Sequence, residues 1–411
     1  MFKWQSYINL GLRAAGLGAK FILIVFIGKY FSTELLGVYG LFSTTITLSV
    51  LVLGLDFYTY NMRELIHTKD SNKPTMLRDQ LVFHLLTYVF AVPLLLLIFL
   101  TDVIPIKYIF WFYLILVLEH FSQEFFRLFT TLSKPITANI ILFVRTGLWI
   151  YVVVAVWIFG SSNFQTLESV FFGWAIGSGL SIGIATYFII QQFKNQHLGK
   201  IQWKWIWTGI KISLPFMLST IASKVIEFSD RYMINWWLGK DDVGVYTFFV
   251  NISNLINVLV FTSVIMIFQP RIIATFKNMG DELKTTKKTF FGQTIGATLL
   301  GAVFVLALIW PLLQFLNKNE FSSEINTFYI LVGANLLLNI SLVYHTFLYA
   351  IKKDRTILYI TIVAALANFV LNFLLILPFG IIGAATSTAI AFGVLMIGKL
   401  VFWKKAEAFN L

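Results

Sequence analysis

Long apolar runs fill this chain, and short polar stretches separate them. The runs reach roughly 20 residues and do not alternate apolar with polar residues at every second position, which predicts membrane-spanning helices rather than the strands of a barrel. A sliding hydropathy window of about 19 residues predicts twelve spans, at 7–28, 36–58, 81–100, 106–126, 136–159, 169–190, 208–228, 243–268, 290–315, 327–350, 357–377 and 381–402. We therefore expect an all-α integral membrane protein.

Composition supports this interpretation. Hydrophobic residues make up 58% of the chain and charged residues 12%, against about 45–50% and 25% in soluble domains. Too little polar surface is available for a soluble domain of any size. The first apolar run is too long for the core of a signal peptide and lacks a small-residue cleavage pattern, so we expect it to be retained as a helix.

Basic residues are distributed unequally between alternate loops, 20 on one side against five on the other. By the positive-inside rule, both termini and the loops after even-numbered spans are expected to be cytoplasmic. The same distribution explains the net charge of +12 without a nucleic-acid partner. The larger set is Lys3, Arg63, Lys69, Lys73, Arg78, Arg127, Lys134, Lys194, Lys200, Lys204, Arg271, Lys277, Lys284, Lys287, Lys288, Lys352, Lys353, Arg355, Lys404 and Lys405, and the smaller set is Lys29, Lys107, Arg231, Lys240 and Lys318.

An internal repeat divides the chain. A Gly-Val-Tyr motif follows the first predicted span at 37–39 and the seventh at 244–246. We expect two lobes of six helices, 1–195 and 196–411. Because six is even, both lobes enter the membrane with the same orientation, so we expect an axis along the membrane normal to relate them. This arrangement predicts a central cleft between the lobes.

Glycines at regular spacing predict where helices cross closely. One span carries Gly173, Gly177 and Gly183, and another carries Gly292, Gly296 and Gly301. Small residues on one helix face allow neighbouring backbones to approach in a membrane. We expect these six positions to be structural.

No motif in the sequence supports enzymatic chemistry. There is no phosphate-binding loop and no His-Glu-x-x-His motif, the five histidines are scattered, and cysteine is absent. ATP hydrolysis, zinc chemistry and thiol chemistry therefore have no support. We expect a protein that is not an enzyme, with no catalytic residue, bound metal or cofactor.

Cations inside the first and fifth spans are the most informative residues, because a charge at the bilayer centre costs about 3 kcal/mol on the insertion scale. Arg13 and Lys20 are seven residues apart and so lie nearly on one helix face, and Arg145 lies near the middle of the fifth span. Either Arg13 extends to the interface or it lines a cavity. Lys20 and Arg145 are too deep to reach the interface, so they line a cavity or pair with Glu119 or Glu124.

The seventh span repeats the seven-residue spacing with Lys224 and Arg231. Glu227 lies between them and is placed to pair with either cation. Arg231 has the same two interpretations as Arg13. Together the five cations predict a ladder across the membrane, in the order Arg13, Arg145, Lys20, Lys224 and Arg231 from inside to outside.

Acidic residues in the spans are candidates for ion coupling. Glu119, Gln123 and Arg127 form a polar stripe of the fourth span at i, i+4 and i+8, with Glu124 beside it. The acids either bind a proton or Na⁺ or neutralise Arg145. Glu227 is a further candidate. For Asp56, near the end of the second span, a helix cap or a pair with Arg63 is favoured over coupling.

Several short motifs give the chain its resemblance to a known family. They are Leu36–Gly40, Gly54–Asp56 leading to Arg63, Leu214-Pro215, Asp230-Arg231, Gly239, Val243–Tyr246, Lys352–Asp354, Asn368, Asn372 and Pro378–Ala385. In these the chain resembles the oligosaccharide-lipid flippases (Wzx) of the polysaccharide-transporter branch of the MATE-like MOP exporter superfamily.

The resemblance implies a multi-pass protein of the bacterial inner membrane. Its implied substrate is an undecaprenyl-diphosphate-linked oligosaccharide, moved from the cytoplasmic to the periplasmic leaflet for O-antigen or a related surface polysaccharide. A proton or Na⁺ and the polysaccharide polymerase and chain-length machinery are the other implied partners. The cationic ladder fits this substrate independently, because a diphosphate needs cationic partners when it leaves water. A MATE-type drug antiporter, which shares the glycine patterns, remains the alternative.

Overall fold

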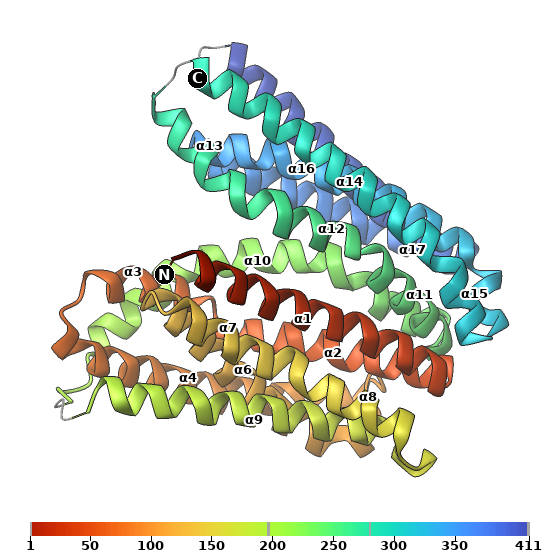
Figure 1. Ribbon diagram of the computed structural model, residues 1–411, viewed down its shortest axis with the longest axis horizontal. Coiled ribbons are helices and arrows are strands. Elements are labelled where there is room, and N and C mark those ends of the chain that lie inside the picture. The colour runs from red at the N-terminus through yellow and green to blue at the C-terminus, as the bar shows by residue number, and fades with distance from the viewer. Residues whose placement is uncertain (1, 195–197, 279–280, 409–411) are drawn as a thin grey trace. The chain divides into compact units, whose positions relative to one another are not determined.

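The computed structural model describes residues 2–194, 198–278 and 281–408. Throughout these ranges the regular structure is helical, with no strand in the part described (Figure 1). This confirms the all-α prediction. Its physical cause is that an apolar segment in lipid satisfies its backbone N–H and C=O groups only within its own helix.

The helices of the first half are α1 (Phe2–Tyr30), α2 (Thr33–Gly54), α3 (Phe57–His67), α4 (Lys73–Leu95), α5 (Leu97–Leu100), α6 (Ile109–Thr131), α7 (Pro135–Phe143), α8 (Trp149–Phe159) and α9 (Leu167–Gln192). A π-helical turn, η3 (Val144–Leu148), joins α7 to α8. Short 3₁₀ turns cover Asp70–Asn72, Ile106–Tyr108 and Ser162–Phe164.

The helices of the second half are α10 (Trp203–Trp237), α11 (Lys240–Ser253), α12 (Leu255–Val260), α13 (Met266–Asn278), α14 (Asp281–Leu316), α15 (Asn319–Ser323), α16 (Ile325–Ala350) and α17 (Asp354–Ala408). A second π-helical turn, η5 (Phe261–Ile265), joins α12 to α13.

Within the described residues, 11 helical segments are long and apolar enough to cross a membrane. The last of them, α17, has 55 residues and a non-helical backbone at Gly380, with φ 61° and ψ −145°. Pro378 lies two residues before this break, and proline interrupts the hydrogen bonding of a helix. Counting α17 as two spans gives the predicted twelve.

The second span ends earlier than predicted, at Gly54 rather than at residue 58. Leu55 and Asp56 follow in left-handed conformations, with φ 46° and 50°, which a right-handed helix cannot include. Asp56 occupies the N-cap position of α3, yet its side chain makes no capping hydrogen bond. The predicted helix cap at Asp56 is therefore wrong. The guanidinium of Arg63 lies 5.4 Å from the centre of the Phe216 ring.

The chain divides into two compact units. Unit 1 comprises Met1–Phe31 with Leu41–Leu218, and unit 2 comprises Ser32–Gly40 with Ser219–Leu411. Helices α2 and α10 therefore contribute residues to both units. The lobes expected at 1–195 and 196–411 stay a prediction.

In unit 1, α6 packs against α7 and α9, and α1 packs against α7, η3 and α8. Aromatic rings fill the interior, and Phe42 stacks on Phe171 with ring centres 4.1 Å apart. The predicted crossing glycines of α9 differ in how closely other residues approach them. A Cβ at Gly177 would lie 2.9 Å from the Val144 carbonyl oxygen, whereas one at Gly183 would meet nothing within 4 Å.

In unit 2, α16 packs along α17, and α14 packs against α12, α13 and α16. A buried cluster includes Phe268, Phe290, Phe347 and Trp403, and the rings of Phe347 and Trp403 lie 5.0 Å apart. Of the predicted crossing glycines in α14, only Gly301 has a close neighbour among the described residues. For the other two, at 292 and 296, the described residues show no close crossing.

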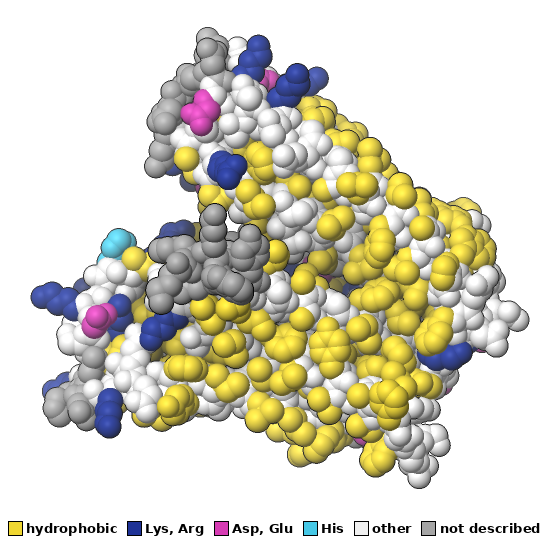
Figure 2. Space-filling view, in the orientation of Figure 1, with side chains coloured by type: hydrophobic (Ala, Val, Ile, Leu, Met, Phe, Trp, Pro, Cys, Tyr) yellow, Lys and Arg dark blue, Asp and Glu magenta, His cyan; other side chains and the backbone are white. Residues whose placement is uncertain are grey.

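The surface matches a chain solvated by lipid along most of its length. On the face drawn in Figure 2, apolar side chains cover the middle of the helices in each unit, and Lys and Arg side chains gather near the helix ends. Large side chains such as Leu100, Phe90 and Leu300 are 80%, 72% and 71% exposed. Apolar area of this extent is stable only in hydrocarbon or against a partner.

Candidate functional site

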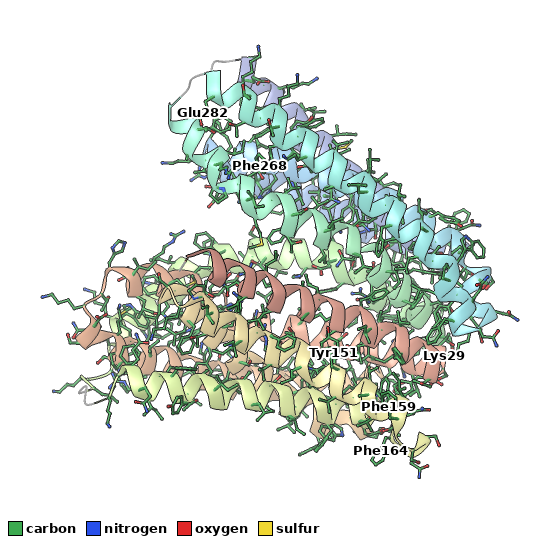
Figure 3. The ribbon with its side chains drawn as sticks, in the orientation of Figure 1. Lys29, Tyr151, Phe159, Phe164, Phe268 and Glu282 are labelled. Carbon is green, nitrogen blue, oxygen red and sulfur yellow. The ribbon has the colours of Figure 1, made fainter. Side chains whose placement is uncertain are left out.

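The candidate site of unit 1 begins at a close crossing of α1 with the α7–η3–α8 segment. A Cβ at Gly147 would lie 3.0 Å from the Cα of Gly16. The Tyr151 hydroxyl, labelled in Figure 3, donates to the backbone oxygen of Ala15 at 2.8 Å. This crossing brings Lys20 of α1 close to Arg145 in η3.

Arg145 lies in the π-helical turn and is only 8% exposed. Such turns are rare and occur often at functional sites. The Arg145 Nη1 lies 3.5 Å from Glu119 Oε1. Among the described residues, its Nε and Nη1 have no hydrogen-bond partner. The guanidinium therefore retains hydrogen-bonding capacity beside its ion pair.

Glu119 is held from α9 through its other oxygen. Its Oε2 accepts hydrogen bonds from Trp174 Nε1 at 3.0 Å and Ser178 Oγ at 3.2 Å. Trp174 stacks on Trp149, with ring centres 6.4 Å apart and planes 3° from parallel. One oxygen of Glu119 is thus fixed by α9, and the other faces Arg145.

Lys20 is exposed and makes no hydrogen bond or ion pair with the residues that the structure describes. The charged groups that act on its ammonium are Arg145 and Glu119. Two cations therefore share one acid at this place. The structure brings together Lys20, Arg145 and Glu119, three of the residues that the sequence singled out.

Arg13 is attached to α7 by a polar chain. Its Nε donates to Asn139 Oδ1 at 2.9 Å, and Asn139 Nδ2 donates to Asn9 Oδ1 at 2.8 Å. We call Arg13, Lys20 and Arg145 the cationic group of unit 1. With Glu119 as the acid that pairs with it, the group has a net charge of +2.

The two predicted cations of unit 2 have different surroundings. Lys224 pairs with Glu227 at 2.5 Å, and both side chains are partly exposed. Arg231 is only 6% exposed and lies with its guanidinium 5.3 Å from the centre of the Phe228 ring. The choice between the interface and a cavity for Arg231 stays a prediction. The order of all five cations across the membrane stays a prediction.

Residues of the resemblance motifs connect helices in unit 2. The hydroxyl of Ser229 donates to Asn368 Oδ1 at 3.1 Å, and Asn372 Nδ2 donates to the same oxygen at 3.2 Å. Asp230 accepts a hydrogen bond from the Tyr246 hydroxyl at 2.6 Å. These bonds join α10 to α17 and to α11.

Glu124, the other acid of the fourth span, does not pair with Arg145. Its Oε1 lies 2.5 Å from Arg127 Nη1, and its Oε2 accepts from Gln80 Nε2 at 2.7 Å. Glu119 is therefore the acid that neutralises Arg145.

Sequence reasoning missed two buried polar features. Lys399, 4% exposed, donates to Ser341 Oγ at 3.0 Å. Its signal was a single lysine inside the run 381–402. His84 and His120 converge in unit 1 although the histidines look scattered along the sequence. Their signal was a polar residue four positions away on each helix, Gln80 before His84 and Glu124 after His120.

Comparisons with known proteins agree with this architecture. The sequence model of a family described as polysaccharide biosynthesis protein matches residues 7–276, and the MatE model matches residues 215–374. No curated protein matches the chain in sequence.

Two solved structures share the fold. One is described as the lipid II flippase MurJ in an inward closed conformation, with a TM-score of 0.74 and 17% identity, over 98% of this chain and 87% of the other. The second is an inward-facing multidrug resistance MATE family transporter of the MOP superfamily, with a TM-score of 0.73 and 14% identity, over 98% and 97%.

Proposed function

We propose that this chain, which belongs to the polysaccharide biosynthesis protein family, is a flippase for undecaprenyl-diphosphate-linked oligosaccharides. It moves repeat units of O-antigen or a related surface polysaccharide from the cytoplasmic to the periplasmic leaflet by alternating access. The chain resides in the bacterial inner membrane with both termini in the cytoplasm. Polysaccharide polymerase and chain-length proteins receive its product.

The observation that carries the proposal is the unpaired charge at Lys20. A lysine side chain on a membrane-spanning helix that makes no hydrogen bond or ion pair with the described residues, beside a buried guanidinium with free hydrogen-bonding capacity, is set to receive an anion. A diphosphate with two ester links carries two negative charges, and the cationic group of unit 1 has a net charge of +2. Charge-assisted hydrogen bonds from Arg and Lys to phosphate oxygens replace the water that the diphosphate loses.

The membrane potential favours the same direction. Moving one charge across 100 mV corresponds to about 2.3 kcal/mol, so two charges correspond to about 4.6 kcal/mol. An inside-negative potential drives an anion outward. Net movement of the diphosphate from the cytoplasmic leaflet is therefore downhill.

Coupling to a proton or Na⁺ adds to this driving force. Glu119, Glu124, Glu227 and Asp56 are the candidate sites. Glu119 is placed best, because a cation bound there would release Arg145 from its pair and change the charge offered to the diphosphate.

Cation-coupled export of drugs is the second candidate function, since the MatE model matches residues 215–374. Cationic drugs require acids in the binding site. The cationic group of unit 1 favours an anionic substrate instead.

Reconstitution tests the proposal directly. Liposomes containing the purified protein and a fluorescent polyprenyl-diphosphate oligosaccharide should show transfer between leaflets that Lys20→Ala reduces. Lys29→Ala, in the last turn of the same helix, is the matched control and should retain the wild-type rate. Transport of soluble cations without transfer of the lipid would favour the drug antiporter.

A deletion strain supplies the cellular test. Lipid-linked units should accumulate facing the cytoplasm, and the surface polymer should disappear while the glycosyltransferases stay active. Normal polymer in a strain without a second flippase would overturn the proposal.

A further inference from the structure

Two histidines and a carboxylate meet in the interior of unit 1, apart from the cationic group. His84 lies on α4, and His120 and Glu124 lie on α6. The two imidazole rings are 4.5 Å apart between centres and nearly perpendicular, at 85°. His84 Nε2 lies 3.8 Å from Glu124 Oε2. Both histidines are buried, and the side chain of Glu124 is 10% exposed.

Each imidazole has one nitrogen engaged and one open. The Tyr88 hydroxyl lies 2.9 Å from His120 Nδ1, and Gln80 Nε2 lies 3.3 Å from His84 Nε2. In the described part of the chain, His84 Nδ1 and His120 Nε2 are buried without a hydrogen-bond partner. A neutral imidazole has one nitrogen free to accept a proton, so each ring is chemically able to become charged.

The charges around the pair favour a proton over a metal dication. Glu124 and Arg127 form an ion pair at 2.5 Å, so their charges cancel. Binding of a proton therefore gives the cluster a net charge of +1. Binding of Zn²⁺ or a similar ion would give it +2, which is costlier in an apolar interior.

The remaining titratable groups do not change this balance. On α3, the Tyr58 ring lies 3.7 Å from the Arg127 guanidinium, and burial raises the pKa of the Tyr58 phenol, so it stays neutral. Tyr88 on α4 is likewise a phenol. Asp56 precedes α3 and acts electrostatically on Tyr58.

The geometry allows one proton and not two. Two imidazolium ions at this ring separation would repel each other strongly in a medium of low polarity. His84 Nε2 lies 3.8 Å from Glu124 Oε2, so His84 is the ring placed to donate a hydrogen bond to this carboxylate when it carries the proton. We propose that His84 and His120 form a site for a single exchangeable proton, held on His84.

A proton on His84 has a mechanical consequence. Glu124 Oε2 accepts a hydrogen bond from Gln80 Nε2 at 2.7 Å, and Gln80 Oε1 accepts one from Asn61 Nδ2 of α3 at 2.5 Å. A charged His84 competes with Gln80 for Glu124 Oε2, since charge-assisted hydrogen bonds are the stronger ones. Displacing Gln80 weakens the link from α4 to Asn61.

The bend that precedes helix α3 is sensitive to the loss of the bond between Gln80 and Asn61. Helix α3 follows the two left-handed residues Leu55 and Asp56, where the chain bends between α2 and α3. Such residues persist only where their surroundings hold them, and the bond from Asn61 to Gln80 is one of these restraints. Protonation of His84 therefore releases α3 about this bend.

Proton uptake by the full-length protein in nanodiscs, without substrate, tests the site. The wild type should take up one proton more than the His84→Gln/His120→Gln double variant between about pH 5 and pH 8, the range in which imidazoles titrate. Imidazole ¹⁵N spectra should place this proton on His84, and His120→Gln should retain it. His67→Gln, on the exposed end of α3, is the matched control and should leave this proton unchanged.

Three results would overturn the assignment. They are uptake of two protons by the pair, no difference from the double variant, and tight binding of Zn²⁺ that both substitutions abolish. Folding of each variant is checked by size-exclusion chromatography. Since no lipid substrate is present, failure here is independent of failure of the proposed flipping activity.

The motion of α3 has its own measurement. The chain contains no cysteine, so spin labels at Ile66→Cys on α3 and Val89→Cys on α4 report one distance. Both positions are exposed, at 63% and 67%. The distance should change between about pH 8 and pH 5 in the wild type and in His120→Gln, and stay constant in His84→Gln. An equal change in His84→Gln would contradict the link from the proton to α3.

Discussion

Gly37 of α2 and Gly244 of α11 lie against each other at a helix crossing within unit 2. A Cβ at Gly37 would lie 3.1 Å from the backbone nitrogen of Gly244, and one at Gly244 would lie 3.0 Å from that of Gly37. Each would also overlap the backbone carbonyl four residues before the other glycine, at Lys240 or Thr33. The two copies of the Gly-Val-Tyr motif thus pack together through equivalent positions.

This crossing predicts that Gly37→Ala and Gly244→Ala each destabilise the protein by about 1–3 kcal/mol, the usual cost of overpacking. Backbone carbonyls cannot move aside as a flexible side chain can. Unfolding of the purified protein in detergent measures the loss. Gly292→Ala and Gly296→Ala are the matched controls, because nothing lies within 4 Å of a Cβ there. Equal effects at all four positions would contradict the crossing.

Lys20 is predicted to act through its charge. Lys20→Ala should lower the flipping rate about tenfold or more, because a hydrogen bond to a charged group contributes about 1.5–3 kcal/mol. Lys20→Arg should retain substantial activity, and Lys20→Glu should be worse than Ala because it repels the diphosphate. Leaflet transfer in liposomes measures each rate at matched protein levels. Full activity of Lys20→Ala would reject the role of the cationic group.

Exchanging the charges of Arg145 and Glu119 is predicted to restore stability but not flipping. Arg145→Ala leaves Glu119 without its paired guanidinium and should cost about 3–5 kcal/mol of stability. The exchange Arg145→Glu with Glu119→Arg should restore most of that stability and the membrane level of the protein. Flipping should stay impaired, because an acid then replaces the guanidinium in η3. If the exchange restored both stability and flipping, the pair would have a structural role only.

Lysine and arginine placement predicts the topology, which reporter fusions check. Fusions should report the cytoplasm after Lys73, Lys200, Lys284 and Lys353. Fusions should report the external side after Asp102, Ser162, Lys240 and Lys318. Because the bias is 20 against five, one ambiguous fusion is tolerable, but two or more inversions would contradict the twelve-span arrangement.

Features that depend on one segment could be predicted from the sequence. Apolar length placed the spans, because a helix in lipid must cover the hydrocarbon thickness. The division of α17 was predicted between residues 377 and 381, and the structure breaks at Gly380. Lys20 and Arg145 were recognised as unusual by depth alone.

Features that depend on two or more helices were decided by the tertiary structure. The sequence left Arg145 with Glu119 or Glu124 as its partner, and these acids, five residues apart on α6, point in different directions. The π-helical turn at Val144–Leu148 changes the direction of Arg145, which residue spacing along an ideal helix cannot anticipate. The structure pairs Arg145 with Glu119.

The histidine pair and the glycines show the same division. His84 and His120 are 36 positions apart and meet only because of how α4 and α6 are rotated about their axes. Gly177 has a close neighbour and Gly183 has none, although both looked alike in sequence. Spacing along the chain determines which side chains share a face of one helix, because helix geometry is local. Which face meets which partner depends on the packing of every helix at once.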